Sequence, residues 1–450
     1  MDNNISENAN LFSVLESDLD KLQLVRINGR VVQVVGLVAE SQGPDVRVGD
    51  LCRICFRDGS HGLDAEVVGF REDRVLLMPL GDLREVGPGS DVLSMDRPLG
   101  VAVSEGLLGR ILDGLGEPLD DKGPLAATDF YPLHADPPHP LRRQMVEKPL
   151  SVGVKVIDGF LTLGTGQRIG IFSGSGVGKS TLLGMMARYT TADVNVISLV
   201  GERGREVREF IERDLGEEGL KRSVLIIATS DQPPLIRLKA ALTATAVAEF
   251  FRDKGKNVLL MMDSVTRVAR AQREIGLAIG EPPATRGYTP SVFEVLPQIL
   301  ERAGAGEYGS ITGVYTVLVE GDDMNEPVAD TVRGVLDGHI VLSRRIASRN
   351  FYPSVSVLES VSRVMPAIVS PEHLAAAGRA RDLLATYAES EDLINIGAYK
   401  AGSSPRVDWA LRHLDSVRAF LAQKVGESSP FEETVRQIVA LAPEEKTDRR

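Results

Sequence analysis

The sequence predicts an α/β protein whose central domain is a mostly parallel β-sheet, with a β-rich domain before it and a helical domain after it. Strand-like apolar runs alternate with helical patterns between about residues 150 and 342. Short β-branched runs separated by Gly, Pro and Asp turns precede them, and strand signals stop at Pro371. Near-continuous apolar strands separated by helices are typical of a parallel sheet that helices cover on both faces.

These changes of pattern divide the chain into four parts. We expect an N-terminal helix in residues 1–24, a β-rich domain in residues 25–97, the central α/β domain in residues 98–370 and a helical domain in residues 371–450. A chain of 450 residues is long enough for several domains of ordinary size.

Composition excludes several classes of protein. The formal net charge of −12 argues against nucleic acid as the main partner, because phosphate backbones attract basic surfaces. No apolar stretch reaches the length of a membrane span, and the N-terminus lacks the pattern of a secretion signal, so we expect a cytoplasmic protein. The 2 cysteines, Cys52 and Cys55, have no second pair nearby and are interpreted as structural thiols, not as a zinc site.

Residues 7–24 carry apolar side chains at helical spacing. Such a helix either packs on its own domain or docks on a partner, and the sequence favours neither interpretation. From residue 29 to about residue 97 the period shortens to that of a small β-sandwich or β-barrel, in which no catalytic constellation is apparent.

The most informative stretch is residues 168–183, where an apolar strand breaks into a glycine-rich turn and a helical pattern begins at Lys179. Gly174, Gly176 and Gly178 allow the backbone N–H groups to curl around phosphate oxygens, and the helix start adds free amides. Lys179 can reach the β- and γ-phosphates, and the Ser180 hydroxyl is placed to hold Mg²⁺. The usual first glycine is Ser173 here, at a position that only opens the turn. The stretch predicts a nucleotide site.

Two acidic residues follow apolar strands of the same domain. Asp263 ends the run 258–262 and is placed to hold Mg²⁺ opposite Ser180. Glu202 follows the run 196–200, where a carboxylate can orient and polarise the attacking water, and Arg203 can neutralise phosphate charge or fix Glu202. Taken alone, the segment around Glu202 is equally consistent with a solvated charged turn.

Residues 150–365 resemble the catalytic subunits of rotary-type ATPases, and within that superfamily the ATPase of type III secretion in its flagellar protein-export form. The segments that carry the resemblance are residues 173–181, 201–207, 259–267, 280–290, 320–327 and 336–344. The resemblance implies a P-loop core of the RecA/F1 type, an N-terminal β-barrel and a C-terminal α-helical domain.

The resemblance also assigns roles to single residues. The residues implied to cradle ATP are Gly174, Ser175, Gly176, Val177, Gly178, Lys179, Ser180 and Thr181, with Thr181 against the α-phosphate and Tyr352 against adenine. Ser180 and Asp263 would hold Mg²⁺. Glu202 would be the catalytic carboxylate, with Arg203, Glu206 and Arg267 around the γ-phosphate. Arg363 would be an arginine finger that serves the neighbouring subunit, a device typically worth a factor of about 10³–10⁵ in rate.

The implied function is Mg²⁺-dependent ATP hydrolysis by a homohexameric ring that energises flagellar type III export, in the cytoplasm and peripherally at the inner membrane. The implied partners are a regulatory protein on the N-terminal helix, a stalk-like coiled coil at the pore near the Tyr288 loop, export substrates and chaperones, and the membrane export gate, with no nucleic acid.

Four other functions are possible for a chain with these motifs. A virulence-type (injectisome) secretion ATPase would share every catalytic residue. A rotary ATP synthase catalytic subunit would take its finger from a different partner subunit, and Arg363 in this chain argues against it. An RNA translocase would need a basic, aromatic N-terminal domain, whereas aromatic residues make up only 5% of the chain. A non-catalytic subunit is disfavoured because Lys179, Glu202 and Asp263 are all present.

Overall fold

The computed structural model describes residues 28–56 and 62–441. The helix expected in residues 7–24 lies outside the described residues. The chain forms two compact units and passes from one to the other between Leu99 and Gly100. Within the described part of the chain, none of the helices combines the length and the apolar character that a membrane crossing needs.

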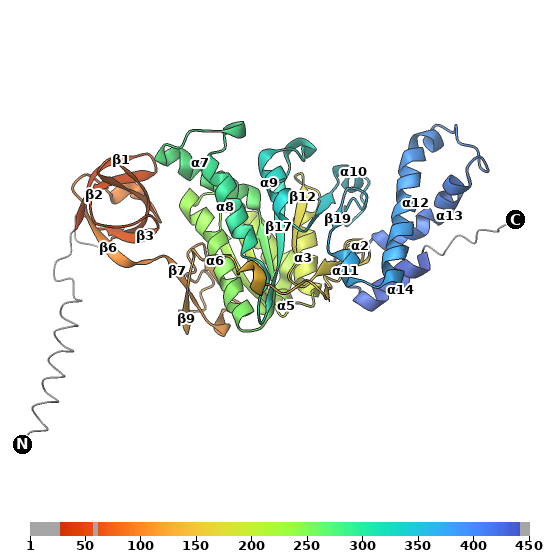
Figure 1. The fold of residues 1–450 in the computed structure, drawn as a ribbon, viewed down its shortest axis with the longest axis horizontal. Coiled ribbons are helices and arrows are strands. Elements are labelled where there is room, and N and C mark those ends of the chain that lie inside the picture. Colours follow the sequence, from red (N-terminus) through yellow and green to blue (C-terminus); the bar gives the residue numbers. More distant parts are fainter. Residues whose placement is uncertain (1–27, 57–61, 442–450) are drawn as a thin grey trace, which may run out of the picture. The chain divides into compact units, whose positions relative to one another are not determined.

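The first unit is a closed antiparallel barrel, drawn in red and orange in Figure 1. Its strands follow one another around the barrel in the order β1-β2-β5-β4-β3-β6. Their bounds are β1 Gly29–Val35, β2 Val38–Gln42, β3 Asp50–Ile54, β4 Leu63–Arg71, β5 Arg74–Pro79 and β6 Asp91–Pro98. Side chains that alternate inward form its core, among them Val31, Ile54 and Leu77, and Cys52 is buried there as well. The β-barrel that the sequence and the resemblance predicted is confirmed.

The second unit is built on a sheet with the strand order β19-β18-β12-β17-β15-β13-β14-β8, in which β16 pairs with β17. The strand bounds are β8 Ile111–Asp113, β12 Arg168–Ser173, β13 Val194–Val200, β14 Ser223–Ala228, β15 Asn257–Asp263, β16 Gly304–Ala305, β17 Ser310–Leu318, β18 Gly338–Leu342 and β19 Val361–Ser362. All neighbouring pairs are parallel except those that β16 and β19 make. Every residue of β13 and β14 is buried, as the continuous apolar runs predicted.

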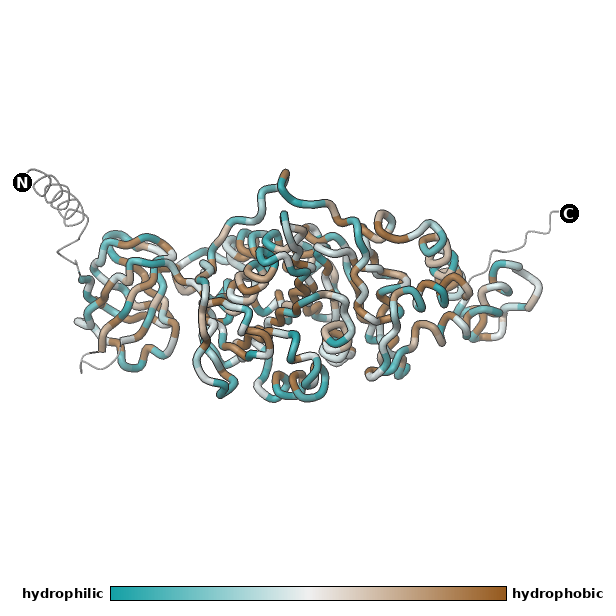
Figure 2. Tube along the Cα trace, turned by 90° about the horizontal axis from the view of Figure 1, so that it is seen from below, coloured by the Kyte–Doolittle hydropathy of each residue, from teal (hydrophilic) through white to brown (hydrophobic). Residues whose placement is uncertain are grey.

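Helices cover both faces of this sheet. Ile197 of β13 packs in one apolar cluster with Leu183 of α3, whereas its neighbour Ser198 donates a hydrogen bond to the Ala240 carbonyl of α6. Because successive strand residues point to opposite faces, α3 and α6 lie on opposite faces. The helix bounds are α3 Lys179–Tyr189, α4 Gly204–Glu209, the π-helix η4 Phe210–Leu215, α5 Gly216–Lys221, α6 Pro234–Asp253, α7 Val265–Ile279, α8 Pro290–Glu301 and α9 Pro327–Val335. Figure 2 shows the apolar strands inside this unit, with polar turns outside them.

Short elements connect these parts. They are β7 Gly100–Val103, β9 Asp129–Pro132, β10 Pro149–Leu150, β11 Leu163–Gly164, α2 Lys155–Phe160, α10 Arg344–Ala347, α11 Met365–Ile368 and the 3₁₀ turns η1 Leu83–Glu85, η2 Glu105–Leu107, η3 Pro140–Arg142, η5 Thr285–Gly287 and η6 Glu320–Asp322. β7 and β9 pair with each other, and so do β10 and β11.

The chain ends in the helices α12 Pro371–Asn395, α13 Pro405–Leu421 and α14 Phe431–Leu441. Ser370 and Ser404 cap α12 and α13 by accepting hydrogen bonds from the backbone three residues on, and a proline opens each helix. The helix predicted over residues 405–425 is too long. The backbone is extended at Ala422, where the chain leaves α13 and turns toward the central sheet.

Candidate nucleotide site

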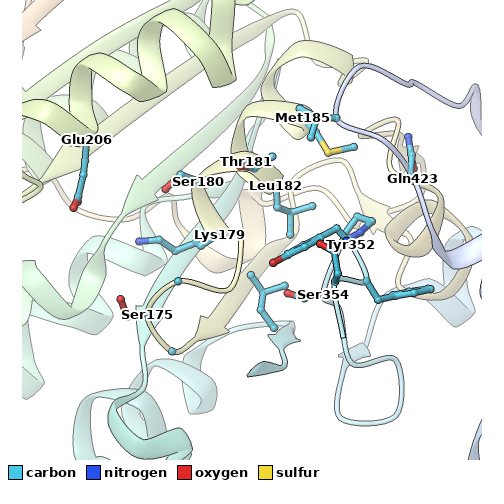
Figure 3. Close-up of a pocket in the computed structure, with 18 of the residues that line it drawn as sticks. Ser175, Lys179, Ser180, Thr181, Leu182, Met185, Glu206, Tyr352, Ser354 and Gln423 are labelled. Carbon is cyan, nitrogen blue, oxygen red and sulfur yellow. The ribbon is translucent and has the colours of Figure 1, made fainter. Parts of the chain in front are cut away.

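A cavity of about 1220 Å³ lies at the carboxyl end of β12, where the chain turns through the glycine loop into α3. Its wall combines the loop, the start of α4, the segment around Tyr352 and the segment 422–427. Figure 3 shows Lys179 and Glu206 at one end, with Tyr352, Met185 and Gln423 at the other. A ligand site at the carboxyl ends of the strands is the expected place in a parallel sheet.

The loop has the backbone that a phosphate cradle needs. Gly176 and Gly178 have φ of 76° and 87°, values that L-residues rarely adopt. α3 begins at Lys179 without a side-chain cap, so its first amides remain free to bind an anion. Ser173, which stands where the first glycine is usual, is buried at the end of β12, and its hydroxyl has no hydrogen-bond partner. The departure from the usual pattern therefore leaves the cradle itself intact.

Most of the loop residues that the sequence assigned to nucleotide binding face this cavity. They are Gly174, Ser175, Gly176, Gly178, Lys179, Ser180 and Thr181. Val177 is the exception: its side chain is buried, and its carbonyl accepts a hydrogen bond of 2.6 Å from the Ser354 hydroxyl. That bond fixes the loop to the segment that carries Tyr352.

Lys179 lies between two carboxylates. Its ammonium forms an ion pair with Asp263 and lies 3.8 Å from Glu202 Oε1. Asp263 is buried at the end of β15 and accepts a hydrogen bond of 2.7 Å from Thr316 on the adjacent strand β17. Only the neighbouring strands β13, β15 and β17 bring these groups together, because the residues are far apart in the sequence.

Glu202 follows β13 at Gly201, where a side chain would collide with Arg267, since a Cβ there would lie 2.7 Å from the Arg267 Cδ. Glu202 is 9% exposed in the folded chain, and its side chain pairs with Arg267 at 3.3 Å. Burial, and next the negative charge of Asp263, raise the pKa of Glu202 to about 7, although Lys179 and Arg267 act in the opposite direction. A carboxyl group with such a pKa is suited to accept a proton near neutral pH.

Arg203 and Glu206 complete this end of the cavity. Both line it, and they pair with each other at 3.0 Å, with 75% of the Arg203 side chain exposed. A hydrogen bond with Glu202 lowers the pKa of Glu206. The Arg203 guanidinium is exposed, so only the Glu206 carboxylate would have to be exchanged for a negative ligand to bind it.

The opposite end of the cavity combines aromatic residues with polar and charged ones. Tyr352 is 42% exposed, and its backbone carbonyl accepts a hydrogen bond of 3.1 Å from the backbone N–H of Gln423. The Gln423 side chain in turn bonds Gly153 and Glu427, which fixes the segment after α13 over the cavity. Sequence reasoning missed this wall, because residues 422–425 were predicted to continue a helix.

Sequence reasoning also missed Asp214, on the π-helix η4. Its carboxyl group forms a hydrogen bond with Thr181 of the loop, and burial raises its pKa. A π-helix in a longer helical run is often found at functional sites, but nothing in the residue pattern of 204–221 distinguished it from an ordinary helix.

Arg363 does not line this cavity. It is exposed directly after β19, and its N–H donates a hydrogen bond to the Asp337 carbonyl. Asp337 is bonded through its own N–H to Arg168, the first residue of β12. The glycine loop begins at the other end of that strand, and six residues of strand span about 20 Å.

Tyr288 is only 5% exposed, and its ring packs under the Arg273 guanidinium. The ring therefore cannot be the surface that a stalk touches. The exposed part of the loop lies before it, where Arg286 pairs with Asp323 at 3.0 Å.

Comparison with known proteins gives consistent matches over both units. Residues 31–95 match the β-barrel domain of the ATP synthase alpha/beta family, residues 153–362 its nucleotide-binding domain, and residues 369–440 the C-terminal domain of the type III secretion ATPase EscN. A flagellum-specific ATP synthase of Bacillus subtilis is 57% identical over 93% of this chain and 96% of its own length. A type 3 secretion system ATPase of Xanthomonas euvesicatoria is 52% identical over 97% of this chain and 99% of its own.

Solved structures agree. The assembled ATPase EscN of enteropathogenic E. coli superimposes with a TM-score of 0.88 at 45% identity, over 92% of this chain and all 100% of that one. The same ATPase in complex with its central stalk EscO gives a TM-score of 0.86 at 44% identity, over 92% of this chain and 100% of that one. The predicted fold class is confirmed.

A glycine loop between a buried strand and a helix, with acidic residues at the tips of neighbouring strands, defines a P-loop nucleotide hydrolase. The chain belongs to the ATP synthase alpha/beta family, within the group formed by the ATPases of type III secretion. It is an ATPase.

Proposed function

We propose that this ATPase drives flagellar type III export as a Mg²⁺-dependent homohexameric ring, in the cytoplasm and held peripherally at the inner membrane. Each copy would bind ATP in its own cavity and complete the site of the next copy with Arg363. The division into residues 1–24, 25–97, 98–370 and 371–450 is part of this proposal, with residues 1–24 serving a regulatory partner.

The chemistry of the cavity supports the catalytic part. Lys179 and the free amides of α3 present positive charge to the phosphates, and Tyr352 offers a face to the base. Glu202 holds the attacking water and accepts its proton, a role that suits a buried carboxyl group with a pKa near 7. Arg203 and Arg267 lie beside it to take up negative charge.

The residues present fit a magnesium ion. Ser180 presents its hydroxyl to the cavity, and Asp263 provides a buried carboxylate against Lys179, so both donors are the oxygen ligands that Mg²⁺ prefers. Bound there, Mg²⁺ would neutralise charge on the phosphates.

One observation carries the ring: Arg363 and the glycine loop lie at opposite ends of β12. The separation of about 20 Å exceeds the reach of an arginine side chain, which argues against a role for Arg363 in its own cavity and supports one in the cavity of another copy. A contact that joins two different surfaces of neighbouring copies is heterologous, and such contacts form a ring when the rotation between copies closes. The assembled state of EscN supports this arrangement.

The test mixes two inactive variants, Glu202→Gln and Arg363→Ala. Each alone should lose hydrolysis, whereas an equal mixture should regain about a quarter of the wild-type rate, since half the subunits keep Glu202 and half of those face an intact Arg363. Arg412→Ala, which changes an exposed arginine of α13, is the matched control and should leave the rate unchanged. An inactive mixture, or full activity of Arg363→Ala alone, would contradict the trans site.

The flagellar assignment is supported by the 57% identity to the Bacillus subtilis protein. Deleting the gene in its own bacterium should then abolish swimming and secretion of flagellar subunits, and restoring the wild-type chain, but not the Glu202→Gln chain, should bring both back. Export substrates, their chaperones and the membrane gate are the partners that this function requires, and the net charge of −12 supports excluding nucleic acid.

A virulence-type secretion ATPase is the second candidate. The match of residues 369–440 to the C-terminal domain of EscN and the 52% identity to the Xanthomonas protein favour it. In that case, the deletion strain would swim normally but fail to secrete effector proteins. The EscN–EscO complex supports a stalk-like coiled coil as a partner of either form, and the contact would use the exposed residues before Tyr288.

A further inference from the structure

Asp337 occupies the turn between α9 and β18, at the edge of the sheet opposite the cavity. It belongs to the segment 336–344 that the family resemblance singled out, yet it does not line the cavity. Its contacts point instead to Arg363, the residue offered to the neighbouring copy.

Asp337 binds the start of β12 through its side chain and its backbone N–H. Its carboxylate accepts hydrogen bonds from the Arg168 backbone at 2.9 Å and from Arg168 Nε at 3.3 Å. Its N–H donates to the Arg168 carbonyl at 2.8 Å. Arg168, the first residue of the strand that leads into the glycine loop, thus both donates hydrogen bonds to Asp337 and accepts one from it.

The carbonyl of the same residue holds the segment that carries the finger. It accepts a hydrogen bond of 3.0 Å from the Arg363 N–H and one of 3.3 Å from the Gln167 side chain. Gln167 is fully buried and also donates to the Ser362 hydroxyl at 3.2 Å. Ser362 at the end of β19 is therefore held by Gln167, and Arg363, the next residue, by Asp337.

The surrounding packing leaves this junction little freedom. Gly338, the next residue, approaches β19 so closely that a Cβ there would lie 2.4 Å from the Val361 carbonyl oxygen. Ser362 donates a hydrogen bond of 3.0 Å to the Thr162 carbonyl on its other side. A shift of β12 along its axis must therefore move the backbone of Arg363 with it.

We propose that Asp337 is a positioning residue for the arginine finger. It fixes the Arg363 backbone to the start of β12, the strand that ends in the glycine loop. The position of β12 in one copy therefore also sets where Arg363 of that copy lies in the cavity of its neighbour. The inference rests on the proposed role of Arg363 in trans.

The test uses Asp337→Asn in the full chain, which keeps the shape of the side chain but removes the charge that binds Arg168. A displaced finger should lower kcat by about 10- to 100-fold, because small misplacements of a catalytic group cost about that much, while the affinity for a fluorescent ATP analogue stays unchanged. Asp330→Asn removes an exposed acidic residue of α9 that pairs with Arg333 one turn away, and it should leave kcat unchanged.

Mixed rings decide where the defect acts. Asp337→Asn mixed with Glu202→Gln should regain activity, since the first variant keeps an intact cavity and the second an intact finger. If Arg363→Ala is rescued in this way but Asp337→Asn is not, the residue acts through its own cavity and the inference is wrong. Unchanged kcat would also refute it, whereas failure of Arg363→Ala itself to be rescued would instead refute the trans site.

Arg168→Gln removes the same ion pair from the other side, together with the pair that Arg168 makes with Glu301, and replaces Asp337→Asn if that chain does not fold. Its kcat should fall and be rescued by Glu202→Gln in the same pattern. A loss that the mixture does not restore would overturn the inference.

Discussion

Replacing Glu202 by glutamine should abolish hydrolysis and, at the same time, stabilise the folded chain at alkaline pH. Glu202 is 9% exposed and its carboxyl group faces the negative charge of Asp263, so its ionised form is disfavoured in the folded state. Glutamine has nearly the same shape and carries no charge. The variant should therefore remove an energetic cost that the enzyme bears for its chemistry.

The magnitude follows from the two pKa values. Folding raises the pKa of Glu202 from 4.5 to about 7, so the folded state binds more protons between these values and stability falls as pH rises through that window. At 1.36 kcal/mol per pKa unit, the full cost above pH 7 is about 3 kcal/mol. Near pH 5.5 it is about 1 kcal/mol, and below the unfolded value it vanishes.

Urea unfolding without nucleotide, followed by the fluorescence of Trp409, measures this difference. Trp409 is the chain's single tryptophan and packs on the apolar core of the second unit, which also contains Glu202. Glu202→Gln should exceed the wild type by about 3 kcal/mol near pH 8 and by about 1 kcal/mol near pH 5.5.

Glu218→Gln, at an exposed glutamate paired with Lys221, is the matched control and should shift neither value by more than a few tenths of a kcal/mol. An equal difference between Glu202→Gln and the wild type at both pH values would refute the reasoning, because the effect would then not come from titration of Glu202.

Two further predictions concern pH and the buried core. For the wild type, kcat/KM should rise about tenfold per pH unit up to about pH 7 and then level off, because Glu202 must be ionised to accept a proton. If kcat/KM were already maximal near pH 5.5, Glu202 would be excluded as the base. Arg302→Ala should cost about 3–5 kcal/mol in urea unfolding, because it leaves Glu249 buried without the guanidinium that now pairs with it at 2.9 Å. Arg302→Ala combined with Glu249→Leu should recover most of that loss, and a loss under about 1 kcal/mol for the single variant would mean that the pair contributes little.

Local sequence determined the framework of the site. The glycine loop, Lys179 and Ser180 follow one another along the chain, so their arrangement is set by the strand before them and the helix after them. Asp263 could be placed at a strand tip because its strand is a continuous apolar run, and Glu202 because it follows another. The alternation of strands and helices was enough to predict a parallel sheet, and short β-branched runs were enough for the barrel.

Contacts between distant segments were beyond local pattern. Gln423 reaches the cavity because α13 ends at Leu421, four residues before the helical pattern suggested. The backbone N–H of Gln423 then donates a hydrogen bond to the Tyr352 carbonyl and not to a carbonyl within the helix. The Tyr288 ring is buried within its own chain, where it packs against the Arg273 guanidinium. Hydrophobic periodicity specifies which face of an element is buried, but not which remote residue it meets.

The tertiary structure alone decided the relation between Arg363 and the glycine loop. Sequence spacing gives no distance between residues 179 and 363, whereas the strand order puts β19 beside β18 and β18 beside β12. Hydrogen bonds through Asp337 then fix the Arg363 backbone at the start of the strand whose other end leads into the glycine loop. Sequence by itself determined that the chain binds a nucleotide, because that site is built from consecutive residues. Only the sheet decided how far Arg363 lies from that site, because the length of β12 separates the two groups by more than a side chain can span.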